Sequence, residues 1–138
     1  MKQQGSYLTV LLTTLLTLAV AVGQNDPGVL KARIPFSFVV AGRTLPPGRY
    51  VLSTLGEQTV RVASSHHQSA FMMTSKVDAR VPAGSGKLVF HRYQDIYFLA
   101  QVWRAGSSQG KQVFKSPVEE DLERKGARME IAVLRTEN

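Results

Sequence analysis

The 138-residue sequence contains no cysteine. This absence excludes a disulfide framework, a thiol nucleophile, a lipid-modified cysteine anchor, an iron–sulfur cluster held by thiolates and a cysteine zinc site. Acids are also scarce in residues 31–115, where 12 Lys and Arg face only Glu57, Asp78 and Asp95, giving a charge of +9. Residues 116–138 have four Lys and Arg against six acids. The basic body suits an anionic polymer, a lipid headgroup layer or an acidic partner, and it also serves solubility alone.

Residues 1–23 have the three parts of a secretory signal peptide. Lys2 gives a positive start, an uncharged run of Leu, Val, Ala and Thr spans residues 8–22, and the small residues Ala21 and Gly23 fit a cleavage site. A membrane anchor is the alternative, but the run contains four threonines and is shorter than the ~20 apolar residues of a spanning helix. We therefore expect an exported protein that resides in the periplasm, in the extracellular space or at the cell surface.

The mature chain is expected to begin near Gln24, with a flexible leader over residues 24–30 and a single β-rich domain over residues 31–138. Apolar residues alternate with polar ones in short runs separated by turn-forming residues, which predicts strands. The expected strands cover residues 33–40, 49–55, 58–63, 69–77, 87–93, 96–103 and 128–135, and residues 105–110 form a Gly/Ser loop. This pattern predicts a mainly β fold, a small antiparallel β-sandwich or barrel of six to eight strands.

One short helix is predicted at about residues 117–125. Ser116 is a suitable N-cap, Pro117 fits the first helical position, and Glu119 completes a capping box. Acids fill the first turn and bases the last, which matches the helix dipole, and Gly126 ends the helix. Because few of its residues are apolar, we expect this helix to rest on the surface of the sheet.

A hairpin is expected where residues 87–93 meet residues 96–103 across a two-residue loop, Gln94–Asp95. That loop predicts three cross-strand pairs: Tyr93 with Ile96, His91 with Phe98, and Val89 with Ala100. One face then collects a larger apolar group: Leu88, Phe90, Tyr97, Leu99 and Trp103. Because both faces are apolar, the hairpin should be covered on both sides.

Two stretches, residues 34–50 (IPFSFVVAGRTLPPGRY) and residues 88–103 (LVFHRYQDIYFLAQVW), resemble a family of small, secreted, uncharacterised bacterial β-rich proteins. The resemblance runs from about Lys31 to the predicted helix. No activity is assigned to this family, so the resemblance implies no catalytic residue. The shorter piece Leu45–Tyr50 is also similar to turns in prealbumin-like and immunoglobulin-like adhesin modules, where it encodes a turn followed by a strand.

Five residues on or beside the hairpin are candidates for ligand binding: His91, Arg92, Tyr97, Trp103 and Arg104. Aromatic rings interleaved with arginines can stack on bases or sugars and pair with phosphates or carboxylates. In the predicted register Arg92 opposes Tyr97, which places both on one face. The alternative is that Tyr97 and Trp103 belong to the core and the arginines extend from its rim.

No metal site, cofactor or catalytic residue is predicted. His66 and His67 are adjacent, so in a strand they point to opposite faces, and no third ligand is near in sequence. Residues 106–110 (GSSQG) have the Gly-x-Ser-x-Gly spacing, but they lie in the expected Gly/Ser loop rather than at a strand-to-helix turn, so they do not predict the nucleophile elbow of hydrolases. The segment Gly84–Lys87 lacks the spacing of a phosphate-binding loop, and no helix is predicted after it.

These observations favour an exported, non-enzymatic domain that binds an anionic or amphipathic molecule or another protein of the cell envelope. A barrel could hold a small hydrophobic molecule in its mouth, whereas a sandwich would bind on a face or an edge. An alternative is a structural or assembly protein whose strand edges pair with neighbours. An envelope hydrolase that uses His91 is the least favoured alternative.

Overall fold

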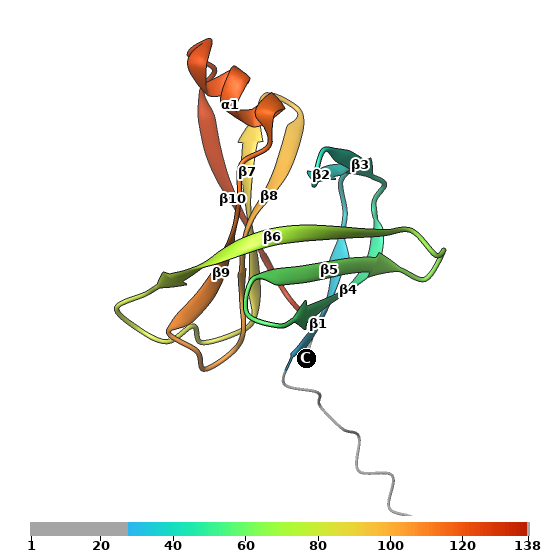
Figure 1. The fold of residues 1–138 in the computed structure, drawn as a ribbon, viewed down its shortest axis with the longest axis vertical. Helices are drawn as coiled ribbons and strands as arrows, with labels where there is room; N and C mark the ends of the chain where they lie inside the picture. Colours follow the sequence, from blue (N-terminus) through green and yellow to red (C-terminus); the bar gives the residue numbers. More distant parts are fainter. Residues whose placement is uncertain (1–27, 138) are drawn as a thin grey trace, which may run out of the picture.

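The computed structural model describes residues 28–137, which form one open sheet of ten strands and one short helix (Figure 1). The expected signal peptide and residues 24–27 of the expected leader lie outside the described residues. The elements in chain order are β1 (Val29–Ile34), β2 (Phe38–Val40), β3 (Arg43–Leu45), β4 (Gly48–Leu55), β5 (Thr59–Ser64), β6 (Ser69–Asp78), β7 (Lys87–Tyr93), β8 (Ile96–Trp103), β9 (Gln109–Val113), α1 (Pro117–Arg124) and β10 (Met129–Arg135).

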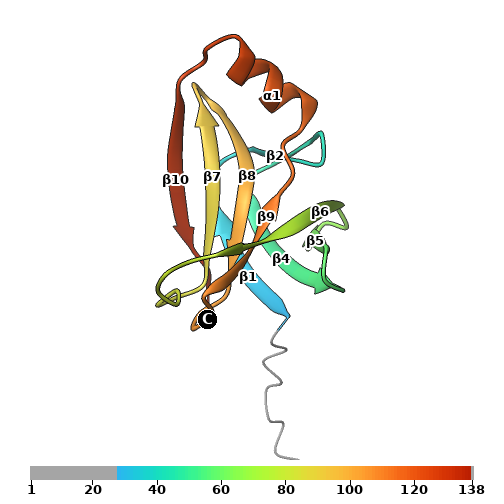
Figure 2. The same ribbon diagram turned by 60° about the vertical axis from the view of Figure 1, so that its left-hand side comes forward.

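The strands follow the order β1-β4-β5-β6-β9-β8-β2-β3, with β7 paired to β8 and β10 paired to β7. All pairs are antiparallel except β2 with β8. The long strand β6 pairs with β5 through residues 69–73 and with β9 through residues 74–78, so it belongs to both halves of the sheet. Figures 1 and 2 show the two halves crossing there, with α1 at the far end of β7, β8 and β10.

The mainly β class with one short helix is confirmed, and the structure adds three short strands to those expected. Pro35 has no backbone N–H, and the expected strand over residues 33–40 divides around it into β1 and β2. The three-residue β3 then pairs with β2. The third, β9, begins inside the expected Gly/Ser loop. It is not predicted from the sequence because the segment QGKQV shows no apolar alternation. β1 begins at Val29, within the range expected as leader.

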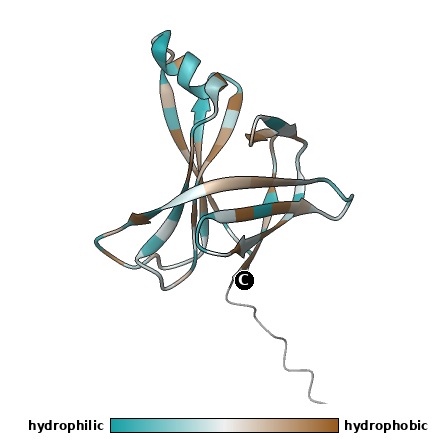
Figure 3. Cartoon of the chain, viewed as in Figure 1, coloured by the Kyte–Doolittle hydropathy of each residue, from teal (hydrophilic) through white to brown (hydrophobic). Residues whose placement is uncertain are grey.

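Alternating side chains of both halves of the sheet meet in one hydrophobic core, and the strands in Figure 3 alternate accordingly between hydrophobic and hydrophilic colours. A row of aromatic rings crosses the core. The centroid of Phe38 lies 5.0 Å from that of Tyr50 and 5.8 Å from that of Phe90. Phe36 lies 5.0 Å from Phe90 and stacks on Tyr97 at 3.8 Å. We call these five rings the aromatic row; it joins β4 of one half to β7 and β8 of the other.

The predicted hairpin register is confirmed from the Gln94–Asp95 loop as far as Phe90, which pairs with Leu99. Beyond this point a β-bulge intervenes, and Val89 pairs with Gln101 rather than with Ala100. The extra residue reverses which side chains face the core, as bulges do.

Trp103 is therefore not on the core face with Phe90 and Leu99, where the regular register would put it. Val102 belongs to the core cluster instead, and Trp103 lies on the opposite face of β8. There its ring covers its partner residue Gly110 on β9, and a Cβ atom on Gly110 would lie only 2.6 Å from the indole ring.

The change Gly110→Ala should therefore destabilise the protein by about 1–3 kcal/mol, because the added methyl group has to displace a buried indole ring. Urea unfolding followed by circular dichroism measures this loss. Gly84→Ala is the matched control, since a Cβ atom there meets nothing within 4 Å, and it should change stability by less than about 0.5 kcal/mol. Equal unfolding midpoints for the two variants would contradict the close approach of Gly110 to the indole.

Candidate functional site

The structure does not bring the five predicted site residues together. Arg92 and Tyr97 share the core-facing side of the β7–β8 hairpin, where they pair. His91 lies on the other side of β7, beneath α1. Trp103 is on that same side at the far end of β8. Arg104 follows β8 and lines a cavity.

His91 helps to hold α1 on the sheet. Its Nδ1 lies 2.7 Å from Oε1 of Glu119, a residue that is only 3% exposed. The hydroxyl of Tyr93 donates to Glu119 at 3.3 Å and to Glu123 at 3.1 Å. Ser116 caps the helix by accepting the Glu119 N–H, but the Glu119 carboxylate contacts the sheet and does not complete the predicted capping box. This arrangement accounts for His91 as a structural contact.

Glu119 and Glu123 of α1 also take part in pKa shifts around the helix. Burial, and next the negative charge of Glu119, raise the pKa of the Tyr93 hydroxyl. The hydrogen bond from Lys115 lowers the pKa of Glu123, and the same bond raises the pKa of Lys115. At neutral pH Glu123 and Lys115 are therefore charged and Tyr93 is protonated, which are the states in which their contacts form.

Arg92 packs over Tyr97, as the register predicts, with its guanidinium carbon 5.4 Å from the ring centroid. The Tyr97 ring also stacks on Phe36. Acids also reach Arg92, at 3.8 Å for both Asp95 and Glu130. Arg92 thus covers Tyr97 at the end of the aromatic row, and its charge is already paired with those of Asp95 and Glu130.

Trp103 is only 6% exposed. Its indole N–H donates to Gln101 at 2.9 Å, and the Lys87 ammonium lies 5.6 Å from its ring centroid. These contacts favour a packing role over ligand stacking, because both the ring and its donor are already engaged.

The cavity that Arg104 lines was not predicted from the sequence. It has a volume of about 110 Å3, and we call it the mouth cavity. Three cationic residues line it: Lys76, Arg104 and Lys111. Four aliphatic residues line it as well: Leu30, Leu52, Val60 and Val102. None of its lining residues is acidic.

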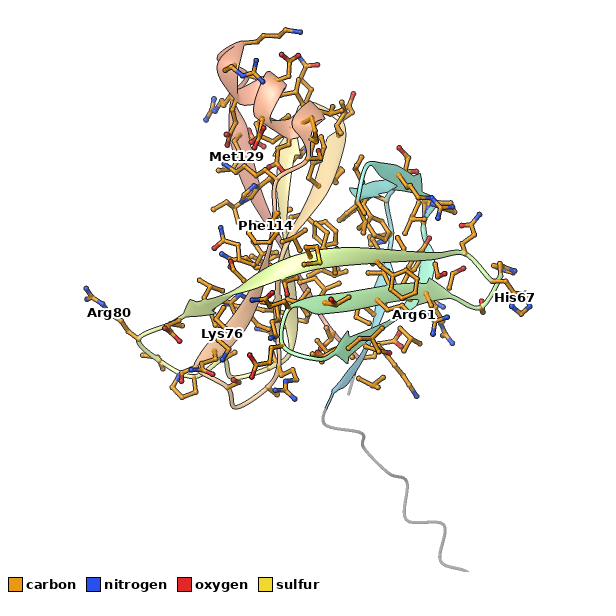
Figure 4. All side chains as sticks on the ribbon, viewed as in Figure 1. Arg61, His67, Lys76, Arg80, Phe114 and Met129 are labelled. Carbon is orange, nitrogen blue, oxygen red and sulfur yellow. The ribbon has the colours of Figure 1, made fainter. Side chains whose placement is uncertain are left out.

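Two of the cations are forced together by the sheet. Lys76 on β6 and Lys111 on β9 are direct cross-strand partners, and Lys111 also pairs with Val102 of β8. The Lys111 ammonium donates to the backbone carbonyl of Glu57. The next acid on this face of β6, Asp78, does not line the cavity. Figure 4 shows Lys76 where β6 and β9 run side by side.

Like charges directly opposite each other destabilise a sheet. The Lys76–Lys111 pair is therefore a feature of the mouth cavity that packing does not explain. The only sequence signal for it is the scarcity of acids in residues 31–115, because no strand is predicted over residues 109–113 and the pairing of β6 with β9 could not be foreseen.

Within residues 28–137, no three His, Asp or Glu side chains converge as metal ligands would. His66 and His67 lie in the turn between β5 and β6, and Figure 4 shows His67 at its tip. In the same part of the chain, none of the helical structure is long and apolar enough to span a membrane.

Comparison with known protein families, curated proteins and solved structures finds no match to this chain. The resemblance to secreted bacterial proteins stays a prediction, and the mouth cavity has to be interpreted from its own chemistry.

The helix attachment predicts the pH dependence of stability for Tyr93→Phe. Because the folded-state pKa of Tyr93 exceeds the unfolded value of about 10, the stabilisation is complete below pH 10 and is lost as the pH rises above it. At pH 8 the variant should be less stable by about 1.5–3 kcal/mol, through the lost hydrogen bonds to carboxylates. Above pH 10 the gap should narrow by up to about 1.4 kcal/mol per pH unit.

Chemical unfolding from pH 8 to 11 measures the gap. Tyr97→Phe is the matched control, since Tyr97 contacts an arginine and a phenylalanine rather than carboxylates. A gap for Tyr93→Phe that stays constant across this range would contradict the assigned shift.

Proposed function

We propose that this protein is a non-enzymatic binding domain that takes a small anionic or amphipathic molecule in the mouth cavity. The observation that carries the proposal is the Lys76–Lys111 pair, which lines the cavity together with Arg104. A bound anion would neutralise charges that repel each other in the empty protein. Relief of this repulsion would therefore add to the free energy of binding.

The size and lining of the cavity narrow the ligand class. A volume of about 110 Å3 lies well below the ~300–1,000 Å3 of pockets that enclose drug-sized molecules. The three cations suit a carboxylate or phosphate group, and the aliphatic side chains suit a short hydrocarbon tail. We infer a short-chain carboxylate or phosphate monoester, with its anionic group between the lysines and its tail against Leu52 and Val60.

The same lining supports binding rather than catalysis. Hydroxyl groups are present on Thr54 and Ser107, but the lining residues include no His, Asp or Glu to serve as a general base. His91, the candidate for a hydrolase, is engaged by Glu119 beneath α1 and does not line the cavity. The signal-like features of residues 1–23 support the proposal that this binding takes place outside the cytoplasm.

The change Lys76→Gln should separate binding from stability. Hexanoate is a suitable probe, and 1-hexanol is its uncharged counterpart. We expect the variant to bind hexanoate about tenfold more weakly in titration calorimetry, because one of the three cations is lost. Its free energy of unfolding should rise by about 0.2–1 kcal/mol, because the like-charge pair is relieved.

Arg80→Gln is the matched control, since it removes the same charge from an exposed position in the loop after β6. It should leave hexanoate affinity unchanged. Added salt should weaken hexanoate binding to the wild type. Equal affinities of the Lys76→Gln and Arg80→Gln variants for hexanoate, or equal binding of hexanoate and 1-hexanol, would contradict the proposed site.

A second candidate function, assembly through a strand edge, is favoured by one observation. Within the described chain β10 pairs only with β7, and its outward side chains include Ile131 and Val133, which are 64% and 59% exposed. A long apolar edge strand is a template for pairing with another chain. Protein–protein assembly would then use β10 and leave the mouth cavity open.

Light scattering over a concentration series tests this second candidate. If β10 mediates assembly, the wild type should associate as its concentration rises, and Ile131→Lys should stay monomeric because two lysines would face each other in the paired edges. Val81→Lys, at an exposed loop position, is the control. A wild type that is monomeric at millimolar concentration would rule out assembly through this edge.

A further inference from the structure

The outer side of β1, β4, β5 and the first half of β6 combines positive charge with exposed apolar side chains. The inward residues of these strands fill the core, so alternate residues point outward. We call this surface the basic face; its members are Lys31, Arg33, Arg49, Arg61, Val51, Leu55, Phe71 and Met73. Phe71 and Met73 are 57% and 54% exposed, respectively.

The strand register sets the order of these residues along the basic face. Arg33 pairs with Arg49 at one end, and Arg61 pairs with Phe71 nearer the other end. Met73 pairs with Thr59, beside Leu55, at the end beyond Phe71. Positive charge thus dominates one end and exposed hydrocarbon the other, over about 20 Å of strand length.

The charge on the basic face is unbalanced. The outward positions of its strands contain no acid. Glu57 lies in the turn after β4, and Glu137 forms a backbone β-bridge with Lys31 at the edge of β1. None of the four cations of the basic face forms an ion pair within residues 28–137.

A cleft at the basic end adds a second, independent observation. It has a volume of about 480 Å3 and is lined by Arg33, Arg49 and His66, with Pro46 and Pro47 along one wall. Its lining residues include no acid. Two arginines without a carboxylate offer charge-assisted hydrogen bonds to a phosphate group.

We propose that the basic face docks on an anionic phospholipid bilayer. The headgroup phosphates meet Arg33 and Arg49, and Phe71 and Met73 enter the boundary between headgroups and acyl chains. Polybasic charge beside exposed apolar side chains is the combination by which peripheral proteins hold such a surface.

Other occupants fit the basic face less well. A second copy would bring arginine against arginine, and single-stranded nucleic acid would need a series of stacking aromatics where the face has only Phe71. The mouth cavity lies on the other side of the sheet, since Leu52 and Val60 line it from inward positions of β4 and β5. Docking therefore goes beyond the proposed function and leaves that cavity uncovered.

Vesicle flotation with the full chain tests this proposal. The probes are phosphatidylcholine vesicles with and without 30 mol% phosphatidylglycerol. We expect preferential binding to the anionic vesicles that weakens as salt is added. The double variant R33Q/R49Q should bind them about 30-fold more weakly, and F71S/M73S about tenfold more weakly.

Two matched variants remove the same groups from elsewhere on the surface. R80Q/R128Q loses two exposed arginines outside the basic face, and V81S/V118S loses two exposed apolar side chains, one in the loop after β6 and one on α1. Both should bind the anionic vesicles as the wild type does, and circular dichroism should show every variant folded.

Equal binding of the wild type to both kinds of vesicle would overturn the proposal. So would equal losses in R33Q/R49Q and R80Q/R128Q, which would assign the attraction to net charge and not to this face.

Discussion

The aromatic row is the packing constraint on which the rest of the structure depends. It fills the core at the end where β8 begins, and it joins Tyr50 of β4 to Tyr97 of β8 through ring contacts. At the opposite end of the core, near Val102 and Leu30, the cavity lining combines aliphatic side chains with cationic and polar ones and includes no aromatic ring. Because the large rings are placed at one end, the interior is solid there and leaves the mouth cavity at the other.

Several acids of the chain attach the helix and the strands around it to one another. Glu119 and Glu123 bind His91, Tyr93 and Lys115, and Glu130 approaches Arg92. These contacts engage carboxylates of residues 116–138 around α1 and β10. The strands of the other half receive none of them. Within residues 28–137, the absence of ion pairs on the basic face and the acid-free lining of the mouth cavity are therefore two results of one segregation of charge along the chain.

Much of the fold could be predicted because the relevant signals are local. Apolar alternation located most strands, and Ser116 and Pro117 located the start of α1. β9 could not be found this way, because glycine and polar residues fill it and its order comes from pairing with β6 and β8. Its loss from the prediction also hid the candidate site, since Lys76 and Lys111 are 35 positions apart in the sequence and meet only across that pairing.

Some of the predicted site residues were placed correctly and others wrongly, again according to whether the signal was local. Arg92 and Tyr97 sit next to a two-residue loop whose geometry sets the register, so their contact could be predicted. Trp103 lies beyond the bulge, where counting from the loop gives the wrong face. The role of Glu119 was missed because a capping box is a local pattern and its partner His91 is 28 residues away.

The bulge in β8 also bears on how this chain should be aligned with others. Ala100 is one residue more than regular pairing requires, and it changes the phase of every position after it on the strand. In a related chain that lacks this residue, the interior side chains would fall at 101 and 103 when positions are counted on from 99 without a gap. An alignment without a gap at that point would equate buried positions of one protein with outward positions of the other, and apparent substitutions there would record a shift in phase, not a change in the core.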